Sequence, residues 1–202
     1  MPQRAREKFL STEIKKENKA RFSSEELNKL FNCNLDFKEK YSINTNSRSI
    51  KENEIFLPLV GEKFDGHDFI NELECISFCA KTHLNKVDKK YHDRLIIVEN
   101  TLDAYHLLAN YYRKKINPKV IGITGSSGKT TTKEIVSAVL SGKYKVHKTN
   151  ANFNNEIGLP KTILEMPEDT EILVLEMAMR AQGEIKYLSK TAQPDIAIIT
   201  NV

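Results

Sequence analysis

A short glycine-rich turn, GSSGKTTT at residues 125–132, is the stretch of this sequence best suited to chemistry. It directly follows the β-rich apolar run KVIGIT at residues 119–124. Two glycines permit a tight turn, and a helix that begins there points backbone N–H groups and its dipole at an anion. A lysine then adds positive charge for the terminal phosphates, and a threonine hydroxyl suits Mg²⁺. The residues predicted to bind the phosphates of a nucleotide are Gly125, Ser126, Ser127, Gly128, Lys129, Thr130 and Thr131.

The turn matches the short pattern G-x-x-G-K-T rather than the full eight-residue phosphate-loop consensus. Ile123 stands where that consensus has its first glycine. The position between a strand and a helix strengthens the match, because phosphate loops occur in this context. An ordinary glycine turn without a ligand is the alternative.

Glu176 is the carboxylate best placed to hold the metal ion of such a site. It lies near the end of the apolar run EILVLEM, residues 171–177, which is typical of a buried strand. A parallel sheet would present it beside the glycine turn, and a carboxylate at a buried strand end is costly unless it is paired or metal-bound. We therefore predict that Thr130 and Glu176 hold Mg²⁺, with a capping or salt-bridging glutamate as the alternative.

An asparagine-rich segment, TNANFNNEIGLP at residues 149–160, is the third candidate. Its amides and the hydroxyl of Thr149 suit an anionic substrate or a metal-bound water, although asparagines are also common in simple turns. The sequence does not decide between these two interpretations. The predicted substrate contacts here are Asn152 and Asn155, and the predicted catalytic residues of the chain are Lys129, Asn154 and Glu176.

Strands alternate with helices after Pro118, and these elements must position the groups above. We expect buried strands at KVIGIT, EILVLEM and DIAIITNV (residues 195–202), and a short helix at GEIKYLSKT (residues 183–191). A longer helix is predicted over residues 128–142, with one side formed by Ile135, Val136, Val139 and Leu140, and with Gly142 as its C-cap. This alternation predicts a doubly wound parallel sheet in a domain at residues 118–202. Because ligands of such folds bind beyond the strand ends, where this sequence stops, we expect an N-terminal piece of a longer protein.

The preceding residues, 22–117, predict a small mixed α/β domain. Short apolar runs at residues 54–60 and 94–99 are separated by polar turns, and residues 101–116 have helical spacing with a basic end. Asn-Pro at 117–118 breaks that helix, so we place the domain boundary there. Residues 1–21 are basic, and a solvated leader is favoured over a nucleic-acid arm because acidic residues are interspersed.

The composition is that of an ordinary soluble globular protein, with 202 residues, 40% of them apolar and 29% charged, and a net charge of +4. The sequence lacks the apolar segment of a signal peptide and any run long enough to span a bilayer, so we expect a cytoplasmic protein without membrane insertion. Three cysteines fit a reducing compartment. Cys75, Cys79 and His83 recur every four residues and would share one helix face, where apolar packing is favoured over a metal site.

Three ordered stretches resemble the ATP-binding central domain of the Mur ligases of peptidoglycan synthesis: GITGSSGKTTTKE, TNANFNNEIGLPKTIL and LEMAMRAQGEIKYLSKTAQPDIAIITNV. A fourth, NTNSRSIKENEIFLPLVGEKFDGHDFI, is similar to the family's uridine-nucleotide-binding domain, with its Asp-Ser-Arg and Gly-x-x-x-Asp-Gly-His signatures. The resemblance covers roughly residues 22–202. Asn46 replaces the usual aspartate of the first signature and Asn53 a common turn glycine. Frequent glycines near the substrate loops are replaced by Ala151, Ala178 and Ala181.

The resemblance implies an ATP-driven amide ligation with ATP and Mg²⁺ as cofactors. Within the family the motifs are most similar to the ligases that join D-Ala-D-Ala to UDP-N-acetylmuramoyl-tripeptide through an acyl phosphate. The UDP-linked substrate would lie near Ser47, Arg48, Asp65, Gly66 and His67. Arg48 is the expected diphosphate partner, and His67 is either a ligand contact or a structural hydrogen bonder.

Three alternatives stay open. The ligase that adds the third peptide residue shares the N-terminal signature but usually carries a serine-rich stretch where this chain reads EMAMRAQGEI. Folylpolyglutamate synthase has a similar phosphate loop but lacks a separate uridine-nucleotide domain. The third alternative is a non-catalytic ATP- or UDP-sugar-binding chain, because the matched region leaves out the adenine pocket and the acceptor-amine site. We therefore expect that the 202-residue chain by itself does not ligate. The sequence does not indicate an oligomeric state, and a monomer is the default expectation.

Overall fold

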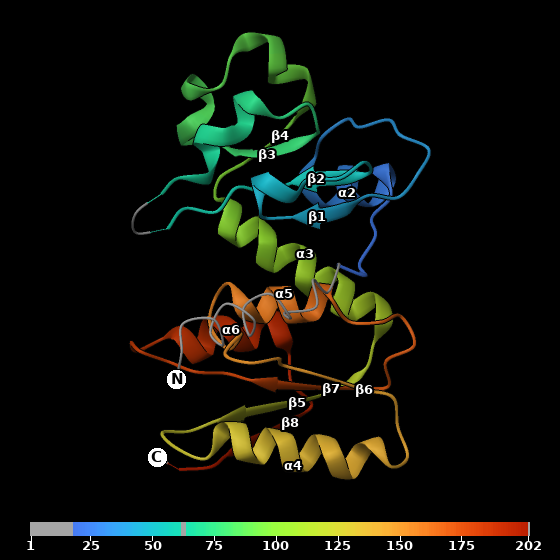
Figure 1. The fold of residues 1–202 in the computed structure, drawn as a ribbon, viewed down its shortest axis with the longest axis vertical. Coiled ribbons are helices and arrows are strands. Elements are labelled where there is room, and N and C mark those ends of the chain that lie inside the picture. The colour runs from blue at the N-terminus through green and yellow to red at the C-terminus, as the bar shows by residue number, and fades with distance from the viewer. Residues whose placement is uncertain (1–17, 62–63, 202) are drawn as a thin grey trace, which may run out of the picture.

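The computed structural model of the chain describes residues 18–61 and 64–201. The leader predicted at residues 1–21 lies mostly outside these described residues. Two four-stranded parallel sheets lie one above the other, and the long helix α3 runs between them (Figure 1). No helix in the described ranges is long and apolar enough to cross a membrane.

The upper sheet in Figure 1 has the strand order β1-β2-β3-β4, and all of its pairings are parallel. Its strands are Ser42–Asn44, Glu54–Phe56, Ser77–Ala80 and Leu95–Val98. Helix α2 (Ser24–Phe31) begins with a capping box, in which Ser23 and Glu26 each accept a hydrogen bond from the other's backbone N–H. Short 3₁₀ helices span Ser47–Ser49, Gly66–Glu72, Lys81–Lys86 and Lys89–Arg94.

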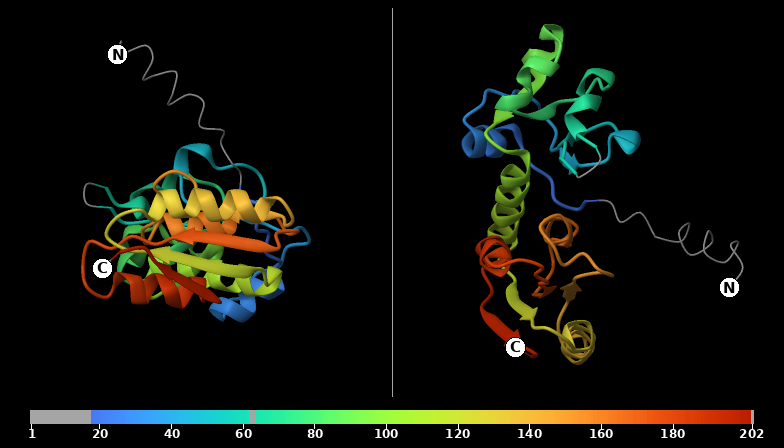
Figure 2. Two further views of the ribbon diagram at one scale, coloured as in Figure 1. Left: turned by 90° about the horizontal axis from the view of Figure 1, so that it is seen from below. Right: turned by 90° about the vertical axis from the view of Figure 1, so that its left-hand side faces the viewer.

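Helix α3 (Thr101–Ile116) begins and ends where the sequence predicts. The side chain of Asn100 accepts hydrogen bonds from the first backbone N–H groups, and Asn117 ends the helix in the left-handed region with φ of 55°. The helix packs against β3 above and against α5 (Gly158–Leu164) and α6 (Glu184–Ala192) below (Figures 1 and 2). It therefore contacts both parts of the chain, and the domain boundary at residue 118 stays a prediction.

The lower sheet has the strand order β6-β7-β5-β8, again with only parallel pairings. Its strands in chain order are β5 (Lys119–Thr124), β6 (Val146–Lys148), β7 (Ile172–Glu176) and β8 (Ile196–Ile199). Helix α4 (Lys129–Ser141) covers one face, while α3, α5 and α6 cover the other (Figures 1 and 2). This arrangement confirms the predicted doubly wound parallel sheet.

The buried side of α4 differs from the predicted one. Val136 and Leu140 pack on the strands, as expected, but Ile135 and Val139 are 59% and 73% exposed. Each helical residue is rotated about 100° from the next, so a seam through positions 136 and 140 turns positions 135 and 139 away from the sheet. Lys133 and Ser137 are the buried members of the inner face instead.

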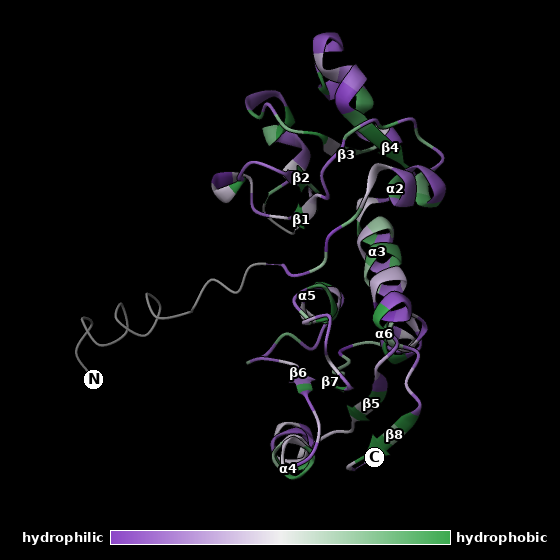
Figure 3. Cartoon of the chain, turned by 90° about the vertical axis from the view of Figure 1, so that its right-hand side faces the viewer, coloured by the Kyte–Doolittle hydropathy of each residue, from purple (hydrophilic) through white to green (hydrophobic). Residues whose placement is uncertain are grey.

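The prediction that β8 is a buried strand is wrong for the described residues. Ile196 and Ile199 are 55% and 65% exposed, although the strand is strongly hydrophobic (Figure 3). The cause is its position at the sheet edge, where it pairs with β5 alone. Apolar composition predicts a strand here, but it does not predict which face is covered.

The predicted helix face of Cys75, Cys79 and His83 is also wrong. Cys79 lies in β3, Cys75 precedes that strand, and His83 lies in the 3₁₀ helix after it. Both cysteines pack in an apolar cluster with Phe56 and Ile70, so the expectation of apolar packing is confirmed for them. Burial raises the pKa of the Cys79 thiol to about 11, which keeps it protonated at neutral pH.

The anchoring of α3 on the segment after α5 can be tested at Tyr112. Its buried hydroxyl donates to the carbonyl oxygen of Met166 at 2.9 Å. Tyr112→Phe leaves that carbonyl without its donor and should lower the free energy of unfolding by about 1–2 kcal/mol in urea denaturation. Tyr144→Phe, at a partly exposed tyrosine, is the matched control and should leave it unchanged. Equal stability of the two variants would show that the Tyr112 hydrogen bond does not anchor α3.

Candidate nucleotide and substrate sites

The glycine turn joins β5 to α4, in the strand–turn–helix order that the sequence predicts. Gly125 and Gly128 have φ of +139° and +77°, where side chains other than hydrogen are strained. A Cβ on Gly125 would lie 2.3 Å from Oγ1 of Thr200, so this glycine also permits a close approach. The first N–H groups of α4 have no partner inside the helix and are available to an anion.

Lys129 folds back over the turn. Its Nζ donates to the carbonyl oxygens of Gly125 at 2.6 Å and Ser126 at 3.3 Å. The ammonium group is therefore held above the same backbone that would cradle phosphates. Ser126, Ser127, Thr130 and Thr131 are all exposed around it.

The carboxylate of Glu176, the last residue of β7, is the buried centre of the site. Its Oε2 accepts from the hydroxyl of Thr130 at 3.0 Å, and its Oε1 accepts from Nδ2 of Asn154 at 2.9 Å. Its backbone N–H donates to Oγ1 of Thr149 at 3.0 Å. The structure thus brings together residues from the turn, from β7 and from the asparagine-rich segment, all of which the sequence singled out.

Lys133 is a member of this site that the sequence analysis missed. It is 1% exposed, and its Nζ lies 3.7 Å from Oε2 of Glu176 and 3.2 Å from Oε1 of Glu134. A buried carboxylate needs a counter-charge, and Lys133 supplies it. The available signal was its position one helical turn after Thr130, which places both side chains on the inner side of α4.

The three asparagines of the segment at residues 149–160 have different surroundings. Only the side chain of Asn154 reaches Glu176. The side chain of Asn155 accepts from the backbone N–H groups of Ile157 and Gly158, where α5 begins, and Asn152 is exposed. The roles predicted for Asn152 and Asn155 in substrate binding stay predictions.

The residues that follow β8 contact the glycine turn, which the sequence did not indicate. The hydroxyl of Thr200 donates to the carbonyl oxygen of Thr124 at 3.2 Å, and the carbonyl of Asn201 accepts from Ser126 N–H at 3.1 Å. These contacts follow from the pairing of β8 beside β5. They depend on sheet order, which local sequence patterns do not contain.

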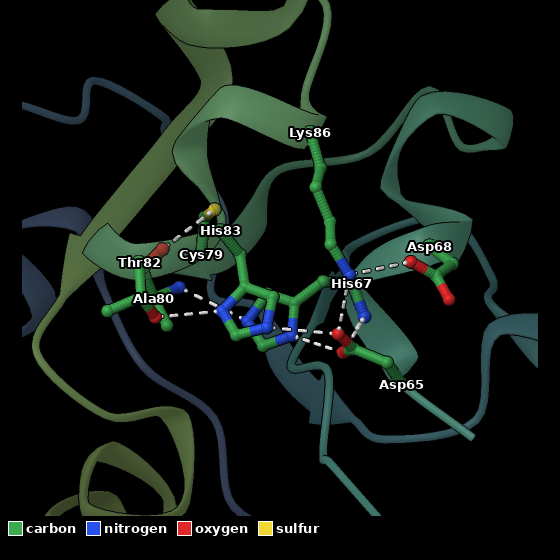
Figure 4. A network of polar contacts seen from close by, with 8 residues as sticks. All are labelled: Asp65, His67, Asp68, Cys79, Ala80, Thr82, His83 and Lys86. Atoms are coloured by element: carbon green, nitrogen blue, oxygen red, sulfur yellow. Dashed lines mark hydrogen bonds and ion pairs between the residues drawn. The ribbon is translucent and has the colours of Figure 1, made fainter. Parts of the chain in front are cut away.

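A second polar cluster lies in the upper part of the molecule, around Asp65 (Figure 4). Its Oδ1 accepts from the backbone N–H and the Nδ1–H of His67, at 3.0 and 2.7 Å. Its Oδ2 lies 3.0 Å from both Nε2 of His83 and Nζ of Lys86. Partial burial alone would raise the pKa of Asp65, but these hydrogen bonds outweigh it and hold the pKa well below its usual range.

The ring of His67 has no lone pair left for a ligand. Its Nε2 accepts from the N–H of Ala80 at 3.2 Å, so the proton sits on Nδ1 and is donated to Asp65. The ring stacks on that of His83 with centroids 4.1 Å apart, and burial lowers the pKa of His67. Asp65, His67 and His83 have the separations of a metal site, but metal binding at His67 would break one or both of these hydrogen bonds. These contacts favour the structural interpretation of His67.

The remaining residues predicted for the uridine-nucleotide site, Ser47, Arg48 and Gly66, take no part in the side-chain contacts of this cluster. Gly66 is packed so closely that a Cβ would lie 2.9 Å from the backbone of Leu59. Ser47 and Arg48 lie on a 3₁₀ turn capped by Asn46, and Arg48 is exposed. No hydrogen bond or ion pair links Arg48 to Asp65 among the residues that the structure describes.

Known ligases are similar to this chain in sequence. Residues 123–202 match the family described as the Mur ligase middle domain. The chain is 47% identical over 163 residues to the UDP-N-acetylmuramoyl-tripeptide–D-alanyl-D-alanine ligase of Bacillus subtilis, covering 80% of this chain and 36% of that protein. The ligase of the same name from Synechocystis is 45% identical over 162 residues, with the same coverage.

Solved structures show the same relationship. MurF ligase from Thermotoga maritima, in complex with ADP, superposes with a TM-score of 0.73 at 40% identity, covering 80% of this chain and 38% of that one. A crystal structure of MurF from Acinetobacter baumannii gives a TM-score of 0.79 at 30% identity, covering 89% and 41%. The chain spans about a third of the length of these curated relatives, 36% for the two compared above. Residues 123–202 therefore match the Mur ligase middle domain, and over about 80% of its length the chain is similar to ligases of that family.

Proposed function

We propose that the chain carries the ATP-phosphate and UDP-sugar sites of a ligase that joins D-Ala-D-Ala to UDP-N-acetylmuramoyl-tripeptide. One observation carries the proposal: Thr130 and Asn154 converge on the buried carboxylate of Glu176, directly beside the glycine turn. The relatives from Bacillus subtilis and Synechocystis are named for this reaction, and the Thermotoga maritima relative was solved with ADP.

The turn would bind the phosphates of ATP through the free N–H groups at the start of α4 and through Lys129. The ammonium of Lys129 would exchange its two carbonyl contacts for phosphate oxygens, which are stronger acceptors because they are charged. Thr130 and Glu176 offer the oxygen ligands that Mg²⁺ prefers, and they already lie in contact. Mg²⁺, when bound, would neutralise charge on the β- and γ-phosphates.

The reaction proposed from the resemblance has two steps. The terminal carboxylate of the tripeptide attacks the γ-phosphorus, which releases ADP and gives an acyl phosphate. The amine of D-Ala-D-Ala then attacks the acyl carbon, loses a proton, and expels phosphate. Lys129 and the amides of the turn would stabilise the transferred phosphoryl group, and Asn154 would orient Glu176.

The uridine nucleotide would bind in the upper part of the molecule, near Ser47, Arg48, Asp65, Gly66 and His67. The exposed guanidinium of Arg48 suits the diphosphate, because its planar fork matches phosphate oxygens. The Asp65–His67 hydrogen bonds hold the loop in place rather than contacting the ligand. We also propose that the protein acts in the cytoplasm, which its free thiols suit, and that it acts as a monomer.

The phosphate site can be tested with Lys129→Ala. Loss of the ammonium group should weaken ATP binding by about 10- to 100-fold in isothermal titration calorimetry, since a charged hydrogen bond contributes about 1.5–3 kcal/mol. Lys114→Ala, at an exposed lysine on α3, is the matched control and should bind as the unaltered chain does. If ATP bound equally well to both variants, Lys129 would have no role in phosphate binding.

The metal site can be tested with Glu176→Gln, which keeps the shape of the side chain and removes its charge. ATP affinity of the unaltered chain should rise when Mg²⁺ is added, and this increase should largely disappear in the variant, because a neutral amide is a poor Mg²⁺ ligand. Glu25→Gln, at an exposed residue of α2, is the control. Circular dichroism checks that Lys133, left with Glu134 alone, does not unfold the variant. A full Mg²⁺ effect in the folded variant would contradict the assignment.

The uridine-nucleotide site can be tested with Arg48→Ala. Titration of UDP-N-acetylmuramoyl-tripeptide should show an affinity about tenfold lower or more, because an arginine–diphosphate contact is a charge-assisted hydrogen bond. Arg21→Ala, at another exposed arginine of the N-terminal part, provides the comparison. Unchanged affinity in Arg48→Ala would identify the arginine as a surface residue.

A further inference from the structure

Two cavities meet at Glu156, between the Asp65 cluster and the end of β7. One, of about 290 Å³, is lined by Glu156, Ala178, Gln182, Glu184 and Tyr187, among others. The other, of about 250 Å³, extends to His67 and His83. Leu102 and Glu156 line both cavities. Glu156 therefore lines both the cavity that reaches the Asp65 cluster and the cavity that reaches Ala178, two residues after Glu176.

The backbone of Glu156 is fixed by His106 of α3. Nε2 of His106 lies 2.7 Å from the carbonyl oxygen of Glu156, and Nδ1 lies 2.6 Å from the hydroxyl of Thr191 in α6. Because a carbonyl only accepts, Nε2 carries the proton, and Nδ1 accepts from Thr191. Burial lowers the pKa of His106, which favours this neutral form. Glu156 is thus held in place against two helices before any ligand binds.

The carboxylate of Glu156 has no hydrogen-bonding or ionic partner among the described residues, although other carboxylates also line these cavities. It is half-buried. The other carboxylates that line the cavities are already engaged: Glu184 accepts from the N–H groups of Arg180 and Ala181, and Glu99 forms an ion pair with Lys81. Neither cavity has a lysine or arginine among its described lining residues. Such a carboxylate is stabilised by a cation that enters from outside.

We propose that Glu156 binds the free ammonium group on the side chain of the last peptide residue of the substrate. This rests on the proposed function. One relative, from Acinetobacter baumannii, is named for adding D-alanyl-D-alanine to 2,6-diaminopimelate, a residue whose far end carries an ammonium group next to a carboxylate. The reacting carboxylate of that residue must reach the turn beside Glu176, and the larger cavity opens at Ala178, two positions further along the chain. The same residue can then place its side chain in the cavity next to Glu156.

The test compares three UDP-N-acetylmuramoyl-tripeptides by calorimetry on the whole chain. Their last residues are lysine, 2,6-diaminopimelate and norleucine, which has the lysine length without the amine. The lysine peptide should bind about tenfold tighter or more than the norleucine peptide, as a charge-assisted contact predicts. The diaminopimelate peptide should lie between them, because Glu156 repels the carboxylate beside its ammonium group. Glu156→Gln should abolish the difference between the lysine and norleucine peptides, and Glu168→Gln, at an exposed residue after α5, should preserve it.

A charge-reversed pair gives an independent measurement. Glu156→Lys should prefer a tripeptide that ends in 2-aminoadipate, whose side chain carries a carboxylate, over the lysine peptide. Equal binding of the lysine and norleucine peptides by the unaltered chain would overturn the inference and leave the proposed function intact. An equal loss for all three peptides in Glu156→Gln would also overturn it, since the residue would then act only on the fold. Absence of binding by every peptide would overturn the proposed function together with the inference.

Discussion

A buried carboxylate at the end of β7 determines how the lower half of this chain is arranged. Glu176 has lost its water, so its charge must be balanced from within the fold. Thr130 and Asn154 donate to its two oxygens, and Lys133 supplies the counter-charge from the inner face of α4. Those partners come from separate segments that meet only when β5 and β7 pair in the observed register, which sets Ile123 opposite Glu176. The carboxylate is buried, and both of its oxygens accept hydrogen bonds. The proposed Mg²⁺ and ATP phosphates would therefore meet a site whose polar groups are already in position.

The upper half of the chain stabilises its own carboxylate in a different way. Asp65 remains partly exposed and is saturated by donors from one stretch of chain, residues 65–86. Both nitrogens of His67 are used in this network, so the network fixes a loop and leaves little capacity for ligand chemistry. The two acidic centres therefore differ in kind. Asp65 fixes the shape of a surface loop, whereas Glu176 lies beside the proposed binding site for phosphates and metal.

Short sequence patterns were enough to predict many of the strands, turns and helices in residues 118–201. The run at residues 119–124 and the glycines at 125 and 128 define a strand, a turn and a helix start, because only neighbouring residues decide those elements. The seam of α4 and the exposure of β8 were not predictable in this way, since they depend on which elements lie above each face. The same holds for His106, whose partners Glu156 and Thr191 are 50 and 85 positions away. A site formed by neighbouring residues, such as the glycine turn, could be predicted from the sequence. Contacts between residues far apart in the chain, such as those of His106, could not.

Helix α3 has a consequence for how the two halves can move. Its first residues border the cavity beside His83, its middle holds Glu156, and its last turns anchor near Met166. A 16-residue helix is about 24 Å long and resists bending. It therefore fixes the distance between the proposed uridine-nucleotide site and the proposed phosphate site. A single inserted or deleted residue would rotate everything beyond it by about 100° and shift it by about 1.5 Å. A change in the length of α3 would therefore misalign the two sites even if every side chain that lines them were kept.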